Sequence, residues 1–314
     1  MIEPPPAPAS DAGAALVDLL NRLDEAGYRF VTPTPSTHRR VAARLDRARP
    51  GDLRDVFGWG RPFAAPDLEP ALFDAMQAGG VLDTQDGLFR SAVRVSALDG
   101  RLHLHSARGV ARDAVFLGPD SYRFVRLLDA VLARVAPPDT ALDIGAGAGA
   151  GALAVASRAP EARVTATDIN PSALRYLTAN AAHAGLPVET LLGSGPEAAP
   201  GEFDLIIANP PYVIDSEQRL YRDGGGALGT DLALAWVEGG LEKLTPGGRF
   251  VLYTGSPIVE GCDLLKAEVE QLAARANAAL TYEELDPDVF GGLLAQDAYS
   301  QVERIAAVGA VLTL

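Results

Sequence analysis

The chain has 314 residues, 48% of them hydrophobic, which is enough for one large domain with a sizeable core and a smaller second domain. No apolar run approaches the roughly 18 residues of a membrane helix, and the acidic, proline-rich start lacks the features of a secretory signal, so we expect a cytoplasmic protein. The single cysteine, Cys262, excludes an internal disulfide and a cysteine-cluster metal site.

The charge is distributed unevenly along the chain. The net charge of −14 lies almost entirely after residue 130, because residues 1–130 balance 16 arginines against 17 acidic side chains. An acidic surface repels phosphate backbones, which proteins bind largely through Lys and Arg. A nucleic-acid partner is therefore disfavoured, and duplex DNA is not expected.

Residues 1–112 are predicted to form the smaller domain, of the α+β class. Leucines at helical spacing predict a first helix over residues 10–27, and the Asp99-Gly100 turn predicts a hairpin of strands 88–98 and 101–105. Three further helices are expected between them, at 36–48, 53–57 and 68–78. Three helices and a hairpin in this order suggest a winged-helix-like module. We interpret it as a substrate-recognition domain, because the last of these helices, at 68–78, has no Lys or Arg with which to read DNA.

Two sets of polar side chains in this domain have an ordinary and a functional interpretation. Arg40, Arg44 and Arg47 share one helix face, which could contact phosphates but is predicted to be a solvated face. His103 and His105 share a strand face and could be imagined as metal ligands. No third ligand accompanies them, so packing roles and no metal are expected.

Residues 113–314 show the alternation of strands and helices that is typical of an α/β domain. Helices are predicted at 120–134, 171–184, 231–244 and 263–274, and a further helix between the first two ends at 157. Seven strands are predicted at 141–144, 164–167, 187–192, 203–208, 249–254, 280–285 and 302–314. Alternating strands and helices require a parallel, doubly wound sheet. The last two strands have no helix between them, which predicts an antiparallel hairpin at the edge of this sheet.

A glycine-rich loop, Asp143-Ile144-Gly145-Ala146-Gly147-Ala148-Gly149, follows the first strand and opens a helix. Its glycines let the backbone approach a ligand closely. Asp168 ends the second strand, where its carboxylate can accept hydrogen bonds from both hydroxyls of a ribose. The two features predict a nucleoside site. Its ligand is either a dinucleotide, bound through Gly145, Gly147 and Ala150, or S-adenosylmethionine, for which Asp143 can approach the methionine end.

The tetrapeptide Asn209-Pro210-Pro211-Tyr212 decides between these ligands. It follows an apolar run, residues 205–208, that reads as a buried strand, so it stands where a strand ends and a loop begins. The two prolines fix φ and remove two N–H donors, which leaves carbonyls of the turn free to accept bonds from outside the chain. An asparagine, a bare carbonyl and an aromatic face on a stiff turn can grip a planar NH2 group. Hydride transfer has no use for such a turn, which favours S-adenosylmethionine.

With these motifs the sequence resembles the class I S-adenosylmethionine-dependent methyltransferases, in particular the amino-methylating branch marked by Asn/Asp-Pro-Pro-Tyr/Phe. Four motifs between residues 115 and 256 carry the resemblance, at 143–149, 166–171, 209–212 and 244–248. Within that branch the chain looks like release-factor glutamine methyltransferases and ribosomal RNA guanine methyltransferases, which also carry an extra N-terminal domain. The resemblance implies a Rossmann-like methyltransferase fold with S-adenosylmethionine as its cofactor.

The resemblance also implies roles for individual residues. Asn209 and the Pro210 carbonyl would each accept one N–H of the acceptor, which aims its nitrogen lone pair at the sulfonium methyl, and Tyr212 would stack on the planar group. The implied cofactor contacts are Asp143, Gly145, Gly147, Gly149, Asp168, Ile169, Ser194 and Asn209. The family commonly has an acid after the third strand that contacts the adenine amino group. This chain has Gly193-Ser194-Gly195 there, and Ser194 is assigned in place of the acid.

Several alternatives stay open for the acceptor and the reaction. A protein glutamine, an RNA base and a small metabolite all carry planar nitrogens. The chain could also use S-adenosylmethionine for other alkyl chemistry, or be a nucleic-acid-binding regulator with a vestigial methyltransferase domain. Residues 221–229, rich in glycine, could close over a substrate. Phe116, Pro119 and Asp120 lie where related enzymes cover the cofactor.

Overall fold

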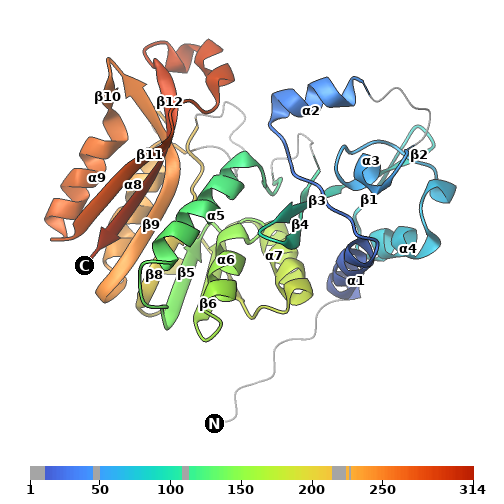
Figure 1. Cartoon of the computed structure of the whole chain (residues 1–314), viewed down its shortest axis with the longest axis horizontal. Coiled ribbons are helices and arrows are strands. Elements are labelled where there is room, and N and C mark those ends of the chain that lie inside the picture. The colour runs from blue at the N-terminus through green and yellow to red at the C-terminus, as the bar shows by residue number, and fades with distance from the viewer. Residues whose placement is uncertain (1–10, 45–49, 108–112, 214–223, 226–227) are drawn as a thin grey trace, which may run out of the picture.

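The fold is described here from a computed structural model. It describes residues 11–44, 50–107, 113–213, 224–225 and 228–314. A large α/β lobe carries a smaller, mostly helical lobe on one side (Figure 1). No helix among these described residues is long and apolar enough to cross a membrane.

The large lobe is built on a central sheet with the strand order β11-β12-β9-β8-β5-β6-β7. Its parallel strands are β5 (Thr140–Ile144), β6 (Arg163–Asp168), β7 (Glu189–Leu192), β8 (Phe203–Ala208) and β9 (Leu244–Val259). The last two strands, β11 (Ala279–Asp286) and β12 (Arg304–Thr313), are antiparallel to each other, and β12 is antiparallel to β9. The mostly parallel sheet and the antiparallel hairpin at its edge are therefore confirmed.

The described sheet has eight strands where the sequence predicts seven. The eighth is β10 (Cys262–Asp263), which folds back on the far end of β9 and pairs with Ile258 and Val259. The turn between them, Glu260-Gly261, has positive φ at both residues, 51° and 72°. Two such residues reverse the chain in the tightest hairpins, so the extra strand is a consequence of this turn.

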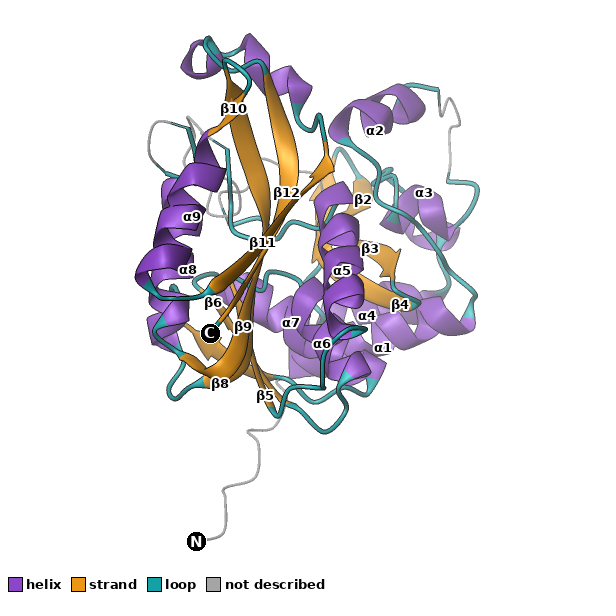
Figure 2. Cartoon of the chain, turned by 60° about the vertical axis from the view of Figure 1, so that its left-hand side comes forward, coloured by secondary structure: helices purple, strands orange, loops and turns teal. Residues whose placement is uncertain are grey.

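Helices cover both faces of the sheet, as a doubly wound fold requires (Figure 2). One face packs against α5 (Pro119–Leu132), α6 (Ala150–Arg158) and α7 (Pro171–Ala184), and the other against α8 (Asp231–Leu241) and α9 (Leu264–Arg275). Neighbouring residues of β8 divide between the two cores: Leu205 and Ile207 join the first, Ile206 and Ala208 the second. A strand buried on both faces must be apolar throughout, which is why residues 205–208 form a continuous apolar run.

The smaller lobe contains four helices and two hairpins among its described residues. The helices are α1 (Asp11–Glu25), α2 (Pro35–Ala42), α3 (Leu53–Phe57) and α4 (Pro70–Ala78). The hairpins pair β1 (Leu82–Gln85) with β2 (Leu88–Ser91), and β3 (Val93–Leu98) with β4 (Arg101–Ser106). The smaller lobe also contains a short 3-10 helix, η1 (Ala65–Asp67), and the large lobe contains three, η2 (Pro196–Ala198), η3 (Gly291–Ala295) and η4 (Asp297–Tyr299).

The prediction of a single strand over 88–98 was wrong, because the chain changes partner near Ala92. The Ala92 N–H bonds the Val81 carbonyl, and β2 and β3 belong to different hairpins. The additional hairpin is closed by Asp86-Gly87, with positive φ at both residues, the same turn chemistry that joins β3 to β4 at Asp99-Gly100. The winged-helix interpretation stays a prediction, and so does the boundary after residue 112, which falls within 108–112 and outside the described residues.

Contacts with α6 and α7 fix the small lobe to the face of the large lobe that these helices cover. The Asn180 side chain on α7 accepts the Leu104 N–H at 2.7 Å and donates to the Leu104 carbonyl at 3.1 Å. A third bond from Asn180 reaches the carbonyl of Ala148, in the glycine loop, at 2.9 Å. The buried amide thus joins strand β4, helix α7 and the glycine loop. His103 and His105 of the same strand are buried, and Ser96 lies 2.8 Å from His105 Nε2, which agrees with packing roles.

Candidate functional site

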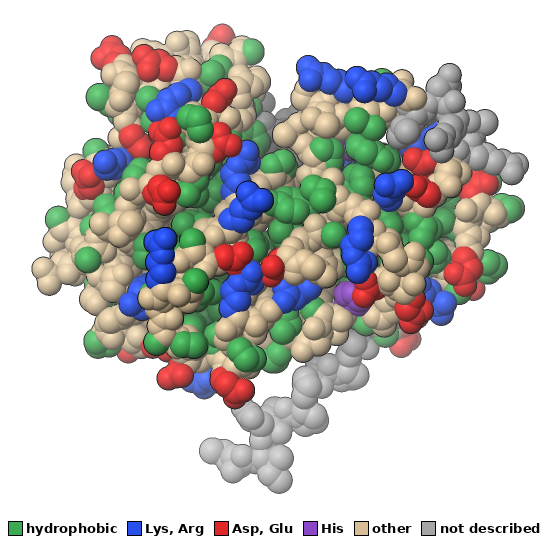
Figure 3. Space-filling view, in the orientation of Figure 1, with side chains coloured by type: hydrophobic (Ala, Val, Ile, Leu, Met, Phe, Trp, Pro, Cys, Tyr) green, Lys and Arg blue, Asp and Glu red, His purple; other side chains and the backbone are tan. Residues whose placement is uncertain are grey.

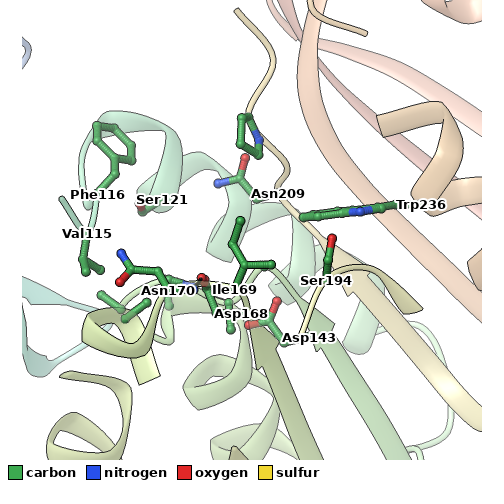
Figure 4. A pocket seen from close by; sticks show the side chains of 18 of the residues that line it. Val115, Phe116, Ser121, Asp143, Asp168, Ile169, Asn170, Ser194, Asn209 and Trp236 are labelled. Atoms are coloured by element: carbon green, nitrogen blue, oxygen red, sulfur yellow. Dashed lines mark hydrogen bonds between the residues drawn. The ribbon is translucent and has the colours of Figure 1, made fainter. Parts of the chain in front are cut away.

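A pocket of ≈ 360 Å³ lies where the parallel strands β5, β6 and β8 end. Figure 4 shows the side chains that converge there from both halves of the sheet. Seven of the eight predicted cofactor contacts line this pocket: Asp143, Gly145, Gly147, Asp168, Ile169, Ser194 and Asn209. The eighth, Gly149, caps α6 at φ +86° and packs over Leu177. The strand ends therefore bring together residues that lie up to 66 positions apart in the sequence.

The glycine loop forms the floor of the pocket. Gly145 and Gly147 have φ of +65° and +55°, a conformation that L side chains rarely adopt. A Cβ added to Gly145 would come within 2.4 Å of the Trp236 ring, so this position has neither the backbone nor the space for a larger residue. The loop is tied to the end of β6, because Ala146 N–H donates to the Thr167 carbonyl at 2.9 Å.

Asp168 stands at the end of β6 with its carboxylate held by backbone amides. One oxygen accepts the Gly147 N–H and the other the Asn170 N–H, both at 2.8 Å. Burial raises the pKa of this carboxyl, and the amide bonds work against that rise. Each carboxylate oxygen can accept more than one hydrogen bond, so Asp168 keeps capacity for two hydroxyl donors in the pocket.

Asp143 lies deeper, at the end of β5, and is 2% exposed. Its Oδ2 accepts the Ala152 N–H of α6 at 2.7 Å. Burial raises the pKa of Asp143 to about 8, and the nearby Asp168 carboxylate adds to that rise against the effect of the Ala152 bond. A Cβ on Gly151 would meet Asp143 Oδ2 at 2.8 Å, so the missing side chain lets α6 approach the carboxyl. A carboxyl with a pKa of about 8 is mostly protonated near neutral pH.

Apolar side chains line the pocket where β6 ends and where α8 packs over the glycine loop. Ile169 is 45% exposed and projects inward from the end of β6, and Trp236 of α8 forms the opposite wall above Ser194 (Figure 4). Two apolar surfaces in one pocket suit a purine ring. Trp236 was missed in the sequence, although Leu232 and Trp236 are four residues apart and so share the face of α8 that lines the pocket.

The Asn209–Tyr212 turn borders the pocket where β8 ends. Asn209 is half-buried and its side-chain amide points into the pocket beside the glycine loop (Figure 4). Pro211 also lines the pocket, whereas Pro210 and Tyr212 are buried behind it. The Tyr212 ring is 8% exposed and packs edge-on against Phe290, with ring centroids 5.6 Å apart. Most of loop 221–229, which was predicted to close over a substrate, lies outside the described residues.

The wall opposite Trp236 comes from the segment before α5 and from its first turn. Val115, Phe116 and Ser121 line the pocket, and Phe116 is 39% exposed (Figure 4). Asp120 is buried just behind this wall, 3% exposed, rather than at the pocket surface. Asn170 completes the rim: it caps α7 through the Ser172 N–H at 2.9 Å and donates to the Asp113 carbonyl at 2.7 Å.

Comparison with known proteins relates this pocket to a family. A family model described as "Methyltransferase small domain" matches residues 125–279, which include the glycine loop, Asp168 and the Asn209–Tyr212 turn. Methyltransferase HEMK2 of Mus musculus is 30% identical over 164 residues, which make up 49% of this chain and 77% of that protein. The chain belongs to the class I S-adenosylmethionine-dependent methyltransferases.

One further relative and one solved structure show how much of this methyltransferase resembles known proteins. Release factor glutamine methyltransferase of Deinococcus radiodurans is 36% identical over 177 residues, 55% of this chain and 62% of that protein. The chain thus spans about three fifths of the length of the first curated relatives it matches. The structure of Trm5b from Pyrococcus abyssi has a TM-score of 0.50 at 16% identity, covering 74% of this chain and 62% of that one, and it shows a shared fold.

The pocket fits S-adenosylmethionine, the cofactor expected for this methyltransferase family. The glycine positions leave room that any Cβ would fill, and Asp168 offers acceptors where a ribose would present hydroxyls. Ile169 and Trp236 offer apolar surfaces for the adenine. Gly193-Ser194-Gly195 follows β7 where the family commonly has an acid, so apolar contact with these walls would have to replace the contact of that acid with the adenine.

Proposed function

We propose that this chain transfers the methyl group of S-adenosylmethionine to a planar amide nitrogen, and that the acceptor is a glutamine of a protein. The observation that carries the proposal is that Asn209 and Asp168 line the same pocket. An acceptor held by Asn209 is then next to whatever the glycine loop and Asp168 bind. The names of the relatives, release factor glutamine methyltransferases, favour a protein glutamine among the possible planar nitrogens.

The residues of the turn explain how a poor nucleophile could react. An amide nitrogen is weakly nucleophilic because its lone pair is delocalised into the carbonyl. Asn209 Oδ1 and the Pro210 carbonyl are proposed to accept one N–H each, which turns the lone pair toward the cofactor. When bound, S-adenosylmethionine supplies an electrophilic methyl group on a sulfonium. Both acceptors are neutral oxygen dipoles, and they stabilise the positive charge that grows on the nitrogen.

Positioning is proposed as the main source of the rate. Holding two reactants in the reactive geometry can contribute roughly 7–11 kcal/mol, and no strong base is needed before the methyl group moves. Tyr212, predicted to stack on the planar group, is buried behind the pocket against Phe290, so its proposed role is to hold the turn in place. The further contacts proposed for the cofactor are those of Asp143, Gly145, Gly147, Gly149, Asp168, Ile169, Ser194 and Asn209.

We further propose that residues 1–112 recognise the substrate and that residues 113–314 bind the cofactor and catalyse the transfer. The small lobe lies beside α7 of the large lobe (Figure 1), and Asn180 of α7 joins its strand β4 to the glycine loop. A recognition domain in this place can hold a protein that presents one side chain to Asn209.

An RNA base is the second candidate acceptor, on one specific observation. Arg39, Arg40 and Arg44 on and after α2 are exposed, and none of them forms an ion pair among the described residues. Basic side chains gather over α2 in Figure 3, whereas acidic ones prevail on the opposite lobe. Arg47, predicted on the same face, lies outside the described residues. Phosphates could bind this patch, but the net charge of −14 opposes a large nucleic-acid interface.

Transfer of a radiolabelled methyl group separates these acceptors. The chain is incubated with labelled S-adenosylmethionine and either a purified bacterial release factor or ribosomal RNA. Label in the release factor, located by mass spectrometry on a glutamine, supports the proposal. Label in RNA alone, or no label in either while the cofactor binds, would contradict the glutamine acceptor.

A further inference from the structure

A buried carboxylate, that of Asp120, lies behind the pocket, between the wall from α5 and strand β9. Asp120, in the first turn of α5, is 3% exposed, and its Oδ1 accepts the Tyr253 hydroxyl of β9 at 2.9 Å. Tyr253 is fully buried. A carboxylate in such a place is costly unless hydrogen bonds and a cation compensate it, so its position calls for a reason.

The turn that carries Asn209 packs on the strand that carries Tyr253. The Tyr212 ring lies over Gly255 of β9, where an added Cβ would come within 2.3 Å of the ring, and its edge meets Phe290. The Tyr212 hydroxyl is buried and forms no hydrogen bond among the described residues. The packing of the ring therefore fixes the position of the last residue of the turn.

The charge of Asp120 is balanced by one arginine, which continues the network to the edge hairpin. Arg123 approaches Asp120 at 3.5 Å and forms an ion pair with Asp286 of β11 at 2.7 Å. Burial raises the pKa of Asp120, whereas the Tyr253 hydroxyl, the Tyr212 hydroxyl and Arg123 lower it. The groups that face the carboxylate are thus two tyrosines and one cation.

The residue next to Asp120 belongs to the cofactor side. Ser121 lines the pocket, and its Oγ accepts the Gly118 N–H at 3.3 Å, which fixes the first turn of α5. The Asp120 carboxylate therefore bridges the α5 wall of the pocket and strand β9, on which the Tyr212 ring packs. Neither Asp120 nor Tyr253 lines the pocket, so they can act on the reaction only through other residues.

We propose that Asp120 is a positioning residue for methyl transfer, which holds the Asn209–Tyr212 turn at a fixed place relative to the α5 wall through the Tyr253 hydroxyl and strand β9, on which the Tyr212 ring packs. This inference rests on the proposed function, because it assumes that Asn209 binds the acceptor. Loss of the carboxylate leaves the cofactor contacts in place and lets the acceptor shift. A shift of about 1 Å can cost on the order of 100-fold in rate.

The test compares Asp120→Asn, Tyr253→Phe and the double variant. We expect the two single changes to slow single-turnover methyl transfer to a release factor at saturating S-adenosylmethionine, with the affinity for S-adenosylhomocysteine unchanged in calorimetry. If Asp120 acts through the hydroxyl of Tyr253, the double variant is no slower than the slower single variant. Effects that multiply would overturn the inference. Asp204→Asn is the matched control, because Asp204 is also hydrogen-bonded but lies near the opposite ends of the strands, bonded to Thr140 and Thr245.

A spectroscopic measurement tests the same inference without an acceptor. In protein labelled with 3-fluorotyrosine, the fluorine resonance of Tyr212 is assigned by its loss in Tyr212→Phe. Asp120→Asn is expected to shift and broaden that resonance and to leave the resonance of Tyr28, in the small lobe, in place. An unmoved Tyr212 resonance would overturn the inference even if no methyl transfer were found. Tyr253→Phe, which keeps the buried ring, provides a second variant if Asp120→Asn does not fold.

Discussion

The two ends of the pocket are built in different ways. At the cofactor end, the parts that hold each other are close in the sequence: the Gly147 N–H and the Asn170 N–H both bond to Asp168 within one βαβ unit. At the acceptor end, the Asn209–Tyr212 turn is held by Gly255, Phe290 and the Asp120 network, which come from distant elements. The cofactor end is therefore a local structure, and the acceptor end depends on the whole lobe being assembled.

This comparison predicts that the two ends can be broken separately, and Asn209 gives the largest effect. Asn209→Ala removes the side-chain acceptor, and we expect methyl transfer to fall on the order of 100- to 1000-fold, as for the loss of one preorganised polar group. Binding of S-adenosylhomocysteine should stay nearly intact, because Asp168 and the glycine loop are untouched. Single-turnover transfer and calorimetry measure the two quantities. Unchanged turnover would remove Asn209 from the acceptor site.

The reciprocal change is Asp168→Ala. It removes a charged acceptor for the ribose and frees two loop amides, so affinity for S-adenosylmethionine should fall roughly 10- to 100-fold. Binding can be followed by the fluorescence of Trp236 in a Trp59→Phe background, since the chain has two tryptophans. Restoring saturation with excess cofactor should restore much of the rate. An unaltered affinity would show that Asp168 does not contact the cofactor.

Gly151 tests how closely the local end is packed. A Cβ at this position would lie 2.7 Å from Phe124 and 2.8 Å from both Asp143 Oδ2 and Ile207. We expect Gly151→Ala to lower the free energy of unfolding by about 1–3 kcal/mol, because three buried neighbours cannot all yield. Gly292→Ala is the control, since nothing lies within 4 Å of its added Cβ. Equal stability of the two variants in urea would refute the close packing at α6.

The pH dependence of the free energy of unfolding tests the environment of Asp143. Its pKa rises from an ordinary value of 3.8 to about 8 on folding, so the folded state binds a proton that the unfolded state has lost. The corresponding stability is fully present below pH 3.8 and is lost as pH rises through about 8, with a slope of at most about 1.4 kcal/mol per pH unit. Asp143→Asn should flatten this decline in melting temperature.

Asp204 should show the opposite sign in the same experiment. Hydrogen bonds led by Thr245 lower the pKa of Asp204, so its contribution is present above its ordinary pKa of 3.8 and is lost as pH falls. Asp204→Asn should therefore change the melting temperature at neutral pH and leave the decline between pH 4 and 8 in place. A wild-type profile that is flat between pH 4 and 8 would contradict the raised pKa of Asp143.

Much of the cofactor end could be predicted from the sequence, because its signals are local. The alternation of apolar strands with helices predicted the doubly wound sheet. The glycine loop and Asp168 predicted the carboxyl ends of β5 and β6. Parallel strands place their carboxyl ends at one edge, which brought seven of the eight predicted contacts into one pocket. The Asp86-Gly87 turn was also readable, since it repeats the Asp99-Gly100 signal, yet the run 88–98 looked like one strand.

The remaining features were decided by tertiary structure. Sequence spacing shows that Tyr212 follows two prolines, but only the packed lobe buries its ring between Gly255 and Phe290. Likewise, Trp236 is one apolar residue of a helix until α8 packs on the sheet and brings the ring against Gly145. The sequence alone determined the strand-end motifs, because backbone geometry and period act over a few residues. The acceptor end was decided by long-range packing, since side chains from α5, β9 and the segment after β11 meet only when the sheet is complete.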